Sequence, residues 1–307
     1  MAIYSRHFCQ QLPKFTSGVS VLSWAYNEEK LIEGFVRRLD ALMGSCVEDY
    51  EIVVVDDGST DATNAILTRL EQEIPQLRLV VNPVNRNVGY SCRRAIASAS
   101  KEFLFWQTID WSYDIDLLRC FLEMLADHDV VAGVRREPTQ CALACAKPVL
   151  GLLRIFGIQH LNIRSDTVQK AFVSVVNYVL IRLLFRVPLS DYQNVVFYRT
   201  AFVQSLTAEA KSSFLNPELL LKAYWSGAAI AEVPIKFIPR TAGEAKGTRV
   251  RAIMASVSDI LKFWVQWMVL GRRNKGAGRI DRLQPAQWDL SAPGTTDQAC
   301  PGPADTL

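Results

Sequence analysis

The chain has 307 residues, of which 50% are hydrophobic and 21% are charged. This composition excludes a disordered protein, which would be polar and rich in charge. With 34 basic and 31 acidic residues the formal net charge is only +3, so we do not expect binding to nucleic acid through a strong global field. The length favours about two domains, although α/β folds often exceed about 200 residues as one unit.

The basic residues are concentrated near the C-terminus. Residues 246–282 hold nine basic and two acidic residues, whereas residues 283–307 hold three acids and no base. A basic segment after a near-neutral body indicates contact with something anionic, such as a membrane surface. A solvated helix end is the alternative explanation.

Cysteine usage and apolar runs give few signals. The seven cysteines and three histidines are scattered and contain no CxxC pair, so we expect neither a zinc site nor a secreted disulfide framework. The first 15 residues lack the apolar core of a signal peptide. The richest apolar run, residues 171–189, is interrupted by Arg182 and Arg186, so a membrane-spanning helix is not expected either.

Short β-rich runs and helical patterns alternate along the first part of the chain. The predicted strands are 19–24, 51–55, 77–81 and 103–106, and the predicted helices are 31–43, 62–70, 90–100 and 115–125. Strand and helix in regular alternation predict an α/β fold with a mainly parallel central sheet and helices on both faces.

Polar side chains follow the carboxyl ends of three of these strands. They are Asn27 and Glu28, then Asp56 and Asp57, and then Asp110. In open parallel sheets, ligands bind beyond the carboxyl ends of the strands. Helix N-capping explains Asp61 and Asp114 well, but it explains acids at three separate strand ends less well. We therefore expect an anionic ligand bridged by a cation.

The same positions carry a family resemblance. AYNEE (25–29), VVVDDGSTDAT (53–63), NRNVGYSCRRA (85–95) and TID (108–110) resemble, in this order, the nucleotide-sugar half of a family-two glycosyltransferase with a GT-A fold. Segments between Gly133 and Lys246 resemble the acceptor half of dolichyl-phosphate mannosyltransferase-like enzymes. The resemblance covers roughly residues 17–270, and its specificity lies in the ordered series, because each motif alone is weak.

The resemblance implies a donor site and a metal site. Asp110 matches the second acid of the family's Asp-x-Asp, and so is expected to be catalytic and to bind Mg²⁺ or Mn²⁺ against the donor pyrophosphate. Thr108 replaces the first acid, which predicts weaker metal binding. The residues expected to hold the base and ribose of the nucleotide sugar are Ala25, Tyr26, Asn27, Glu28, Asp56, Asp57, Asn87 and Gly89.

The acceptor half supplies a second candidate catalytic residue, Asp191, which the resemblance places against the sugar or the acceptor. An alcohol acceptor would use it as a general base. A phosphate acceptor is already anionic and would depend more on cations, because arginine forks match phosphate geometry. The candidate cations are Arg135, Lys170, Arg199, Arg240 and Lys246. For each of them a surface salt bridge is the alternative.

Two later segments look unlike ordinary protein surface. Between Ala252 and Leu270, one helical face carries Ile253, Val257, Ile260, Leu261, Trp264, Trp267 and Met268, with Ser258, Asp259, Lys262 and Gln266 opposite. Flanking basic residues complete the pattern of a helix lying in a membrane interface; a helix packed on the sheet is the alternative. Residues 142–161 are apolar, fall where the family has its acceptor loop, and are expected to dip into lipid.

The predicted organisation is an N-terminal extension (1–16), a GT-A domain (17–248), an amphipathic membrane-interface helix (249–275) and a disordered tail (276–307). The predicted function is an inverting hexosyltransferase that moves a sugar from a nucleotide diphosphate sugar to a polyprenyl (dolichyl-type) phosphate. We expect a cytoplasmic protein, peripherally associated with the membrane face, with no nucleic-acid partner. One alternative is transfer to a glycolipid or polysaccharide hydroxyl. The alternative from another class is a degenerate, non-catalytic nucleotide-sugar binder.

Overall fold

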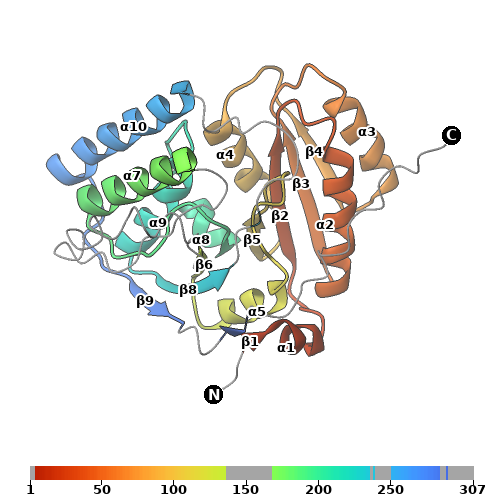
Figure 1. Ribbon diagram of the computed structural model, residues 1–307. Coiled ribbons are helices and arrows are strands. Elements are labelled where there is room, and N and C mark those ends of the chain that lie inside the picture. The colour runs from red at the N-terminus through yellow and green to blue at the C-terminus, as the bar shows by residue number, and fades with distance from the viewer. Residues whose placement is uncertain (1–3, 136–167, 236–237, 239–249, 284–287, 290–307) are drawn as a thin grey trace.

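A computed structural model describes residues 4–135, 168–235, 238, 250–283 and 288–289 (Figure 1). The strands are β1 (Tyr4–Ser5), β2 (Val19–Ala25), β3 (Tyr50–Asp56), β4 (Leu77–Val81), β5 (Phe103–Trp106), β6 (Val130–Arg135), β7 (Val196–Arg199), β8 (Ala229–Ile235), β9 (Arg279–Arg282) and β10 (Trp288–Asp289). The α-helices are α1 (Arg6–Gln11), α2 (Ile32–Cys46), α3 (Thr63–Glu73), α4 (Val88–Ser98), α5 (Leu118–Glu123), α7 (Val168–Phe185), α8 (Thr200–Ser205), α9 (Leu215–Trp225) and α10 (Val250–Trp264). A 3₁₀ turn, η1 (Met124–Ala126), follows α5, and a π-helical turn, η3 (Val265–Val269), continues α10.

The central sheet has eight strands in the order β4-β3-β2-β5-β7-β6-β8-β9. Every neighbouring pair is parallel except the two that involve β7, which runs antiparallel to both β5 and β6. A mainly parallel sheet was predicted and is confirmed. The strands predicted at 77–81 and 103–106 occur with the same bounds.

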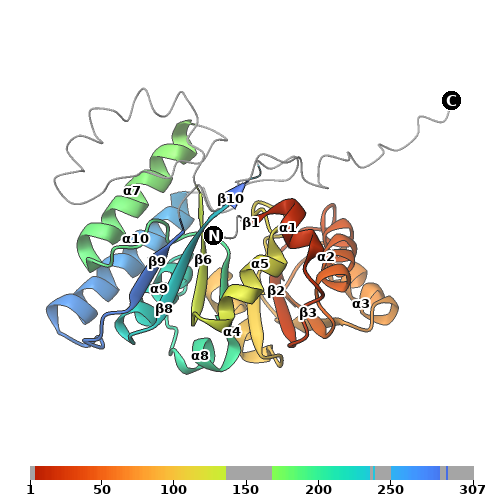
Figure 2. The ribbon, with the colours of Figure 1, turned by 90° about the horizontal axis from the view of Figure 1, so that it is seen from below.

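Helices cover both faces of the sheet, as predicted (Figures 1 and 2). Successive residues of a strand point to opposite faces, so Ile52 and Val54 join one apolar core while Val53 and Val55 join the other. The first core packs under α2, α3 and α5. The second packs under α4, α7, α8, α9 and α10.

The start of α5 differs from the prediction. The α-helix begins at Leu118 rather than near residue 115, and no side chain caps it. Asp114 is therefore not its N-cap: one of its carboxylate oxygens accepts a hydrogen bond from the Asp116 N–H at 3.1 Å, one turn before the helix. Asp61 does act at the start of α3, because it accepts the Thr63 N–H at 3.0 Å.

A disulfide joins Cys9 in α1 to Cys120 in α5, with 5.7 Å between their Cα atoms. The scattered cysteines did not predict it, because the two residues are 111 positions apart and only the fold brings them together. The bond ties the N-terminal segment to the helices on the first core.

The C-terminal helix extends from Val250 through the π-helical turn to Val269, but part of its predicted lipid-facing side is buried. Ile260 and Trp267 of that side lie inside the second core, together with Phe263, which was not part of the predicted face. Asp259 was predicted to face water, but it is half-buried and one of its carboxylate oxygens accepts the N–H groups of Lys211 and Ser212 and the Ser212 hydroxyl, at 3.0, 3.0 and 2.7 Å.

The segment after this helix also differs from the expected disordered tail. Within residues 276–307, Arg279–Arg282 form β9 and extend the sheet beside β8. Arg282 donates to the buried Glu232 carboxylate at 3.0 Å, which anchors the strand. Within the described part of the chain, every helix falls short of what crossing a bilayer requires in length or in apolar character.

Candidate functional site

The first two loops of the candidate site meet where β2 and β3 end. Ala25 and Asp56 are register partners at these ends, and the Asp57 N–H donates to the Ala25 carbonyl at 2.8 Å. Asn27 has a left-handed φ of 52° and is held by the other loop, because its side-chain oxygen accepts the Thr60 N–H at 2.8 Å. The Glu28 N–H donates to the Thr63 hydroxyl at 2.8 Å. The structure thus brings together the residues predicted at the first two strand ends.

Asp56 and Asp57 are both buried but are used differently. Both oxygens of Asp56 hold its own loop: Oδ1 accepts the Ser59 N–H at 3.0 Å and Oδ2 accepts the Asn64 amide at 2.8 Å. Asp57 uses only Oδ1, which accepts the Asn82 amide at 2.7 Å and the Arg86 N–H at 2.9 Å. Within the described residues, Oδ2 of Asp57 is therefore the oxygen left for a ligand.

The third loop, residues 82–87, packs on the second. Gly58 has a φ of +69°, and a Cβ atom there would lie 2.5 Å from the Val84 backbone, so only glycine allows this approach. Asn87 has a φ of 69° and precedes α4. Gly89 is a packing residue, because its N–H donates to the Lys211 carbonyl at 3.2 Å and a Cβ atom would meet the Ala210 carbonyl at 2.4 Å.

The predicted metal ligand lies in a tight turn after β5. The hydroxyl of Thr108 and Oδ1 of Asp110 both accept the Ser112 N–H, at 3.2 and 3.3 Å, so the two oxygens converge on one point. Trp111, with a φ of 52°, is buried beside them with the Arg38 guanidinium 3.9 Å above its ring.

This turn fits a hard divalent cation. Mg²⁺ is commonly bound by one or two carboxylates together with substrate phosphates and water, and Asp110 with Thr108 supplies one carboxylate and one neutral oxygen. Among the described residues there is no group of three or more His, Cys, Asp or Glu side chains that could hold a metal by themselves. Two protein oxygens would leave the remaining ligands of such a cation to water or to substrate phosphate.

Asp191, the second predicted catalytic residue, forms a buried ion pair with Arg135 at the end of β6. Arg135 Nε lies 2.7 Å from Oδ2 of Asp191, and Nη2 lies 2.9 Å from Oδ1. The Gln193 N–H also donates to Oδ1 at 3.0 Å. Burial alone would raise the pKa of the Asp191 carboxyl, but the charge and hydrogen bonds of Arg135 outweigh burial and hold it below its ordinary value.

A family comparison decides what kind of domain carries these loops. The sequence model described as "Glycosyl transferase family 2" matches residues 20–180, which include the loops after β2, β3 and β4 and the Asp110 turn. The chain belongs to glycosyl transferase family 2.

Curated relatives of this family-2 chain are larger proteins. It is 28% identical over 262 residues to glycosyltransferase AglD of Haloferax volcanii, covering 83% of this chain and 38% of that protein. It is 38% identical over 71 residues to an undecaprenyl-phosphate 4-deoxy-4-formamido-L-arabinose transferase of Enterobacter sp. (strain 638), covering 23% of this chain and 21% of that protein. The chain thus spans at most 38% of the length of either relative.

Solved structures confirm the predicted GT-A fold of the family-2 domain. A glucosyl-3-phosphoglycerate synthase from Mycobacterium tuberculosis, in complex with phosphoglyceric acid, matches with a TM-score of 0.52 at 16% identity, over 80% of this chain and 79% of that one. Mannosyltransferase PcManGT from Pyrobaculum calidifontis, in complex with GDP-Man and Mn²⁺, matches with a TM-score of 0.51 at 16% identity, over 84% and 70%. At such identities the likeness concerns the fold alone.

Arg199, one of the predicted acceptor cations, lies away from the candidate site. Arg199 ends the antiparallel strand β7 and pairs with Phe103, the first residue of β5. Asp110 follows the last residue of β5, whereas Arg199 lies beside the first residue, so the two are at opposite ends of the strands. Its guanidinium donates to the Leu125 carbonyl at 2.7 Å and lies 3.6 Å from Glu102. The strand pattern in the sequence did not show that β7 is antiparallel to its neighbours.

The other predicted cations divide into two groups. Arg135 does lie beside Asp191, although as its ion-pair partner. The side chain of Lys170, and all of Arg240 and Lys246, lie outside the described residues, as does the apolar segment 142–161.

Glu232, for which no role was predicted, holds the Asp191 loop through Ser190. Its carboxylate is buried in β8, accepts the Ser190 hydroxyl at 2.6 Å and the Ser190 N–H, and pairs with Arg282 at 3.0 Å. Burial raises the pKa of Glu232 despite these donors. The signal in the sequence was a lone acid within the apolar run 228–235, a pattern that requires buried partners.

Proposed function

We propose that this family-2 chain is a glycosyltransferase that moves a sugar from a nucleotide diphosphate sugar to a polyprenyl phosphate. The observation that carries the proposal is the convergence of the loops after β2, β3 and β4 around Asp57, with the Asp110 turn after the neighbouring strand β5. A nucleoside diphosphate has a polar nucleoside at one end and two charged phosphates at the other. A carboxylate that accepts hydrogen bonds suits the first end, and a cation site beside it suits the second.

On the donor side, each loop has a stated task. Oδ2 of Asp57 accepts a hydrogen bond from a ribose hydroxyl or a base N–H, a strong interaction because the acceptor is charged. Asn27 and Glu28 shape the neighbouring wall of this site. Asp110, with Thr108, holds Mg²⁺ or Mn²⁺. When bound, the cation neutralises charge that develops on the leaving nucleoside diphosphate.

The Asp191–Arg135 pair favours a phosphate acceptor over a hydroxyl acceptor. A general base must be able to take a proton, whereas both oxygens of Asp191 are occupied and its pKa lies below the ordinary value. A phosphate oxygen is already anionic and attacks without a base. Direct displacement by that oxygen inverts the anomeric carbon. The name of the undecaprenyl-phosphate transferase relative is in keeping with this choice.

The proposed contact with the membrane is a face of α10 that shares only Leu261 with the one the sequence predicted. Seven large apolar residues of α7, α10 and the following turn are 41 to 61% exposed. They are Val176, Leu183, Met254, Leu261, Val265, Val269 and Leu270. Spacings of four and seven place those within each helix on one side. We call this set the apolar stripe.

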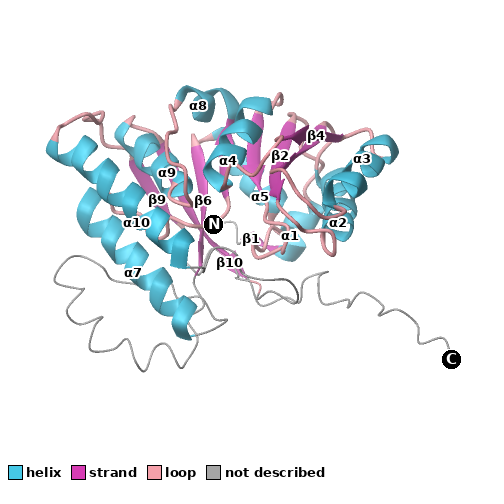
Figure 3. Cartoon of the chain, turned by 90° about the horizontal axis from the view of Figure 1, so that it is seen from above, coloured by secondary structure: helices cyan, strands magenta, loops and turns pink. Residues whose placement is uncertain are grey.

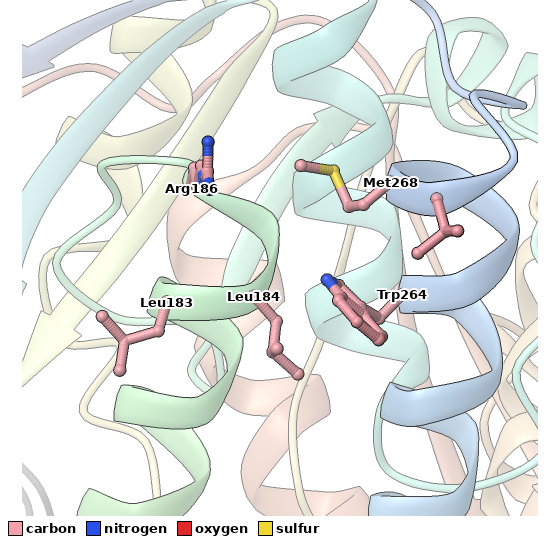
Figure 4. Close-up of a pocket in the computed structure, with 6 residues that line it drawn as sticks. Leu183, Leu184, Arg186, Trp264 and Met268 are labelled. Carbon is pink, nitrogen blue, oxygen red and sulfur yellow. The ribbon is translucent and has the colours of Figure 1, made fainter.

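The two halves of the apolar stripe meet between the helices. Helices α7 and α10 lie side by side (Figure 3). Leu183 and Val269 both line a cavity of about 330 Å³ between them, in which Leu184, Trp264 and Met268 face one another (Figure 4). Many large apolar side chains exposed on neighbouring helices commonly mark a membrane or protein contact, and a lipid acceptor favours the former.

Release of nucleoside diphosphate, measured over a panel of nucleotide sugars, tests the function. We expect release that depends on both Mn²⁺ or Mg²⁺ and a polyprenyl phosphate. Release with a glycolipid hydroxyl but not with the lipid phosphate would favour the hydroxyl-directed transferase. Binding of a donor without release under any condition would favour a non-catalytic nucleotide-sugar binder.

A further inference from the structure

We propose that a cationic cavity beside the end of α10 binds the phosphate of an anionic phospholipid. The inference rests on the membrane contact of the proposed function and adds to it a headgroup site. The cavity measures about 440 Å³, within the range of about 300–1,000 Å³ that is usual for ligand pockets. Residues that line it include Lys222, Trp225 and Ser226 of the α9 end, and Arg272, Arg273 and Asn274 after η3.

The cavity carries an uncompensated positive charge. No acidic residue is among the described residues that line it. Lys222 is neutralised, because its amine lies 2.7 Å from Glu218 and 3.6 Å from Glu209. Arg272 and Arg273 have no ion pair with any residue in the described part of the chain. Two guanidinium groups are therefore available to an anion.

The arginines are presented in a way that suits phosphate. The Arg273 guanidinium lies 5.2 Å from the centre of the Trp225 ring, and such contact with an aromatic face leaves the N–H edges of an arginine free to donate. Asn274 approaches Ser226, with 3.4 Å between its amide nitrogen and the hydroxyl. Planar guanidinium forks bind phosphate oxygens in pairs, which makes them more specific than a point charge.

The position of the cavity indicates a lipid rather than a soluble anion. Val269 and Leu270 are 60% and 58% exposed, and they end the apolar stripe two residues before Arg272. Gly271, with a φ of +68°, turns the chain between the two regions. A phospholipid has the same order of a charged region next to an apolar one, because glycerol joins its phosphate directly to its acyl chains. A headgroup in the cavity would place its chains against the stripe.

Helix chemistry offers a competing explanation for the same arginines. Cations at the C-terminal end of a helix interact favourably with its dipole, and both α9 and α10 end near the cavity. Arginines with only that role would affect stability but would not distinguish one lipid from another. The test therefore requires a readout of lipid selectivity as well as of stability.

Vesicle sedimentation of the full chain supplies that readout. The vesicles are pure phosphatidylcholine or equal parts phosphatidylcholine and phosphatidylglycerol. The variant is Arg272→Gln with Arg273→Gln, and the matched control is Arg251→Gln with Lys262→Gln, which removes the same charge from α10 outside the cavity. We expect the cavity variant to lose about tenfold more binding to the anionic vesicles than the control, the factor that corresponds to about 1.4 kcal/mol of lost interaction. Ser226→Trp, which fills the cavity without changing its charge, should reproduce most of that loss.

Several outcomes would overturn the inference. Equal losses in the two double variants would show general attraction only, and a fall in Tm without a change in lipid preference would show a helix-end role only. Protection of the wild type by inorganic phosphate in a thermal melt, without any preference for phosphatidylglycerol, would assign the cavity to a soluble phosphate. Sugar transfer to a short-chain soluble acceptor, measured in parallel on the wild type, keeps failure of this site distinct from failure of the proposed function.

Discussion

Arg135 and Asp191 form a two-point ion pair, at 2.7 and 2.9 Å, that joins the end of β6 to the loop before β7. Both side chains are almost fully buried. The pair ties Arg135, the last residue of β6, to the loop that leads into β7 at Val196.

Breaking this pair is expected to cost stability and activity together. Asp191→Asn leaves Arg135 buried without a counter-charge, and removal of one partner of a buried pair typically costs about 3–5 kcal/mol. Urea unfolding followed by tryptophan fluorescence measures the loss. If Asp191 were instead only a general base, Asp191→Asn would abolish transfer and leave the urea midpoint unchanged.

The pair also predicts how stability depends on pH. The pKa of Asp191 is lower in the folded chain than in the unfolded chain, so its contribution is present above the unfolded pKa and is lost as pH falls through the folded pKa. Thermal melts across the acidic range should show this loss in the wild type. The Asp191→Asn variant should lack that component.

Asp57 is expected to bind the donor, whereas Asp56 is expected to hold its own loop. Asp57→Ala should weaken binding of the free nucleoside diphosphate by about 1–3 kcal/mol, the usual effect of losing a partner of a buried polar group. Asp57→Asn is the matched variant. It keeps an oxygen that can accept from Asn82 and Arg86, and it replaces the second carboxylate oxygen with an amide N–H₂, which donates hydrogen bonds instead of accepting them. Calorimetry would contradict the assignment if both variants bound the nucleotide as tightly as the wild type.

Thr108 and Asp110 predict a weak but real dependence on a divalent cation. Asp110→Ala should abolish nucleoside diphosphate release and leave the melting temperature within a few degrees of the wild type, because Asp110 lies in a half-buried turn outside the strands and helices. Thr108→Asp adds a second carboxylate beside the first and should lower the Mn²⁺ concentration needed for half-maximal release. Full activity in excess EDTA would exclude the metal role.

Glu232 predicts the opposite pH response to Asp191. Burial raises the pKa of this carboxyl in the folded chain, so its contribution is present below the unfolded pKa and is lost as pH rises through the folded pKa. Glu232→Gln removes that titration and the ion pair with Arg282, but it keeps an oxygen for Ser190. We expect a flatter stability profile above the ordinary glutamate range in the variant, measured by thermal melts. An unchanged profile would mean that Glu232 is ionised throughout.

The sequence was informative where a signal is local. Strands β4 and β5 were predicted with their observed bounds, because an apolar run between turn residues is a local pattern. The polar loops after β2 and β3 lie at neighbouring strand ends for the same reason, because parallel strands put their carboxyl ends on one side of the sheet; that these loops bind the donor stays a prediction. Asp57 could be located at that edge, but its bond to Asn82, 25 residues away, depends on packing.

Non-local features explain what the sequence did not predict. Arg199 was placed in the site because nothing in four strand residues shows that β7 runs antiparallel. The pairing of Arg135 with Asp191, 56 residues apart, and of Cys9 with Cys120 depends on the finished fold. The spacing of apolar residues in α10 identified an apolar face of that helix but not what covers it. The second core buries part of that face.

The burial of Trp267, which the sequence placed on the lipid-facing side of this helix, gives the last prediction. Trp267 is buried against Phe185, Phe214 and Phe263, with ring centroids 4.7 to 6.3 Å apart. Trp267→Ala should therefore destabilise the fold by about 3–5 kcal/mol, as large-to-small core changes do. Leu261 and Val265 lie on the exposed side, so Leu261→Ser with Val265→Ser should change stability little and weaken vesicle binding, since about 25 cal/mol is lost for each Å² of apolar surface that no longer enters lipid. Urea unfolding and vesicle sedimentation on both variants separate the two effects. Weak vesicle binding by a stably folded Trp267→Ala variant, with wild-type binding by the double variant, would restore the tryptophan face as the one that meets the membrane.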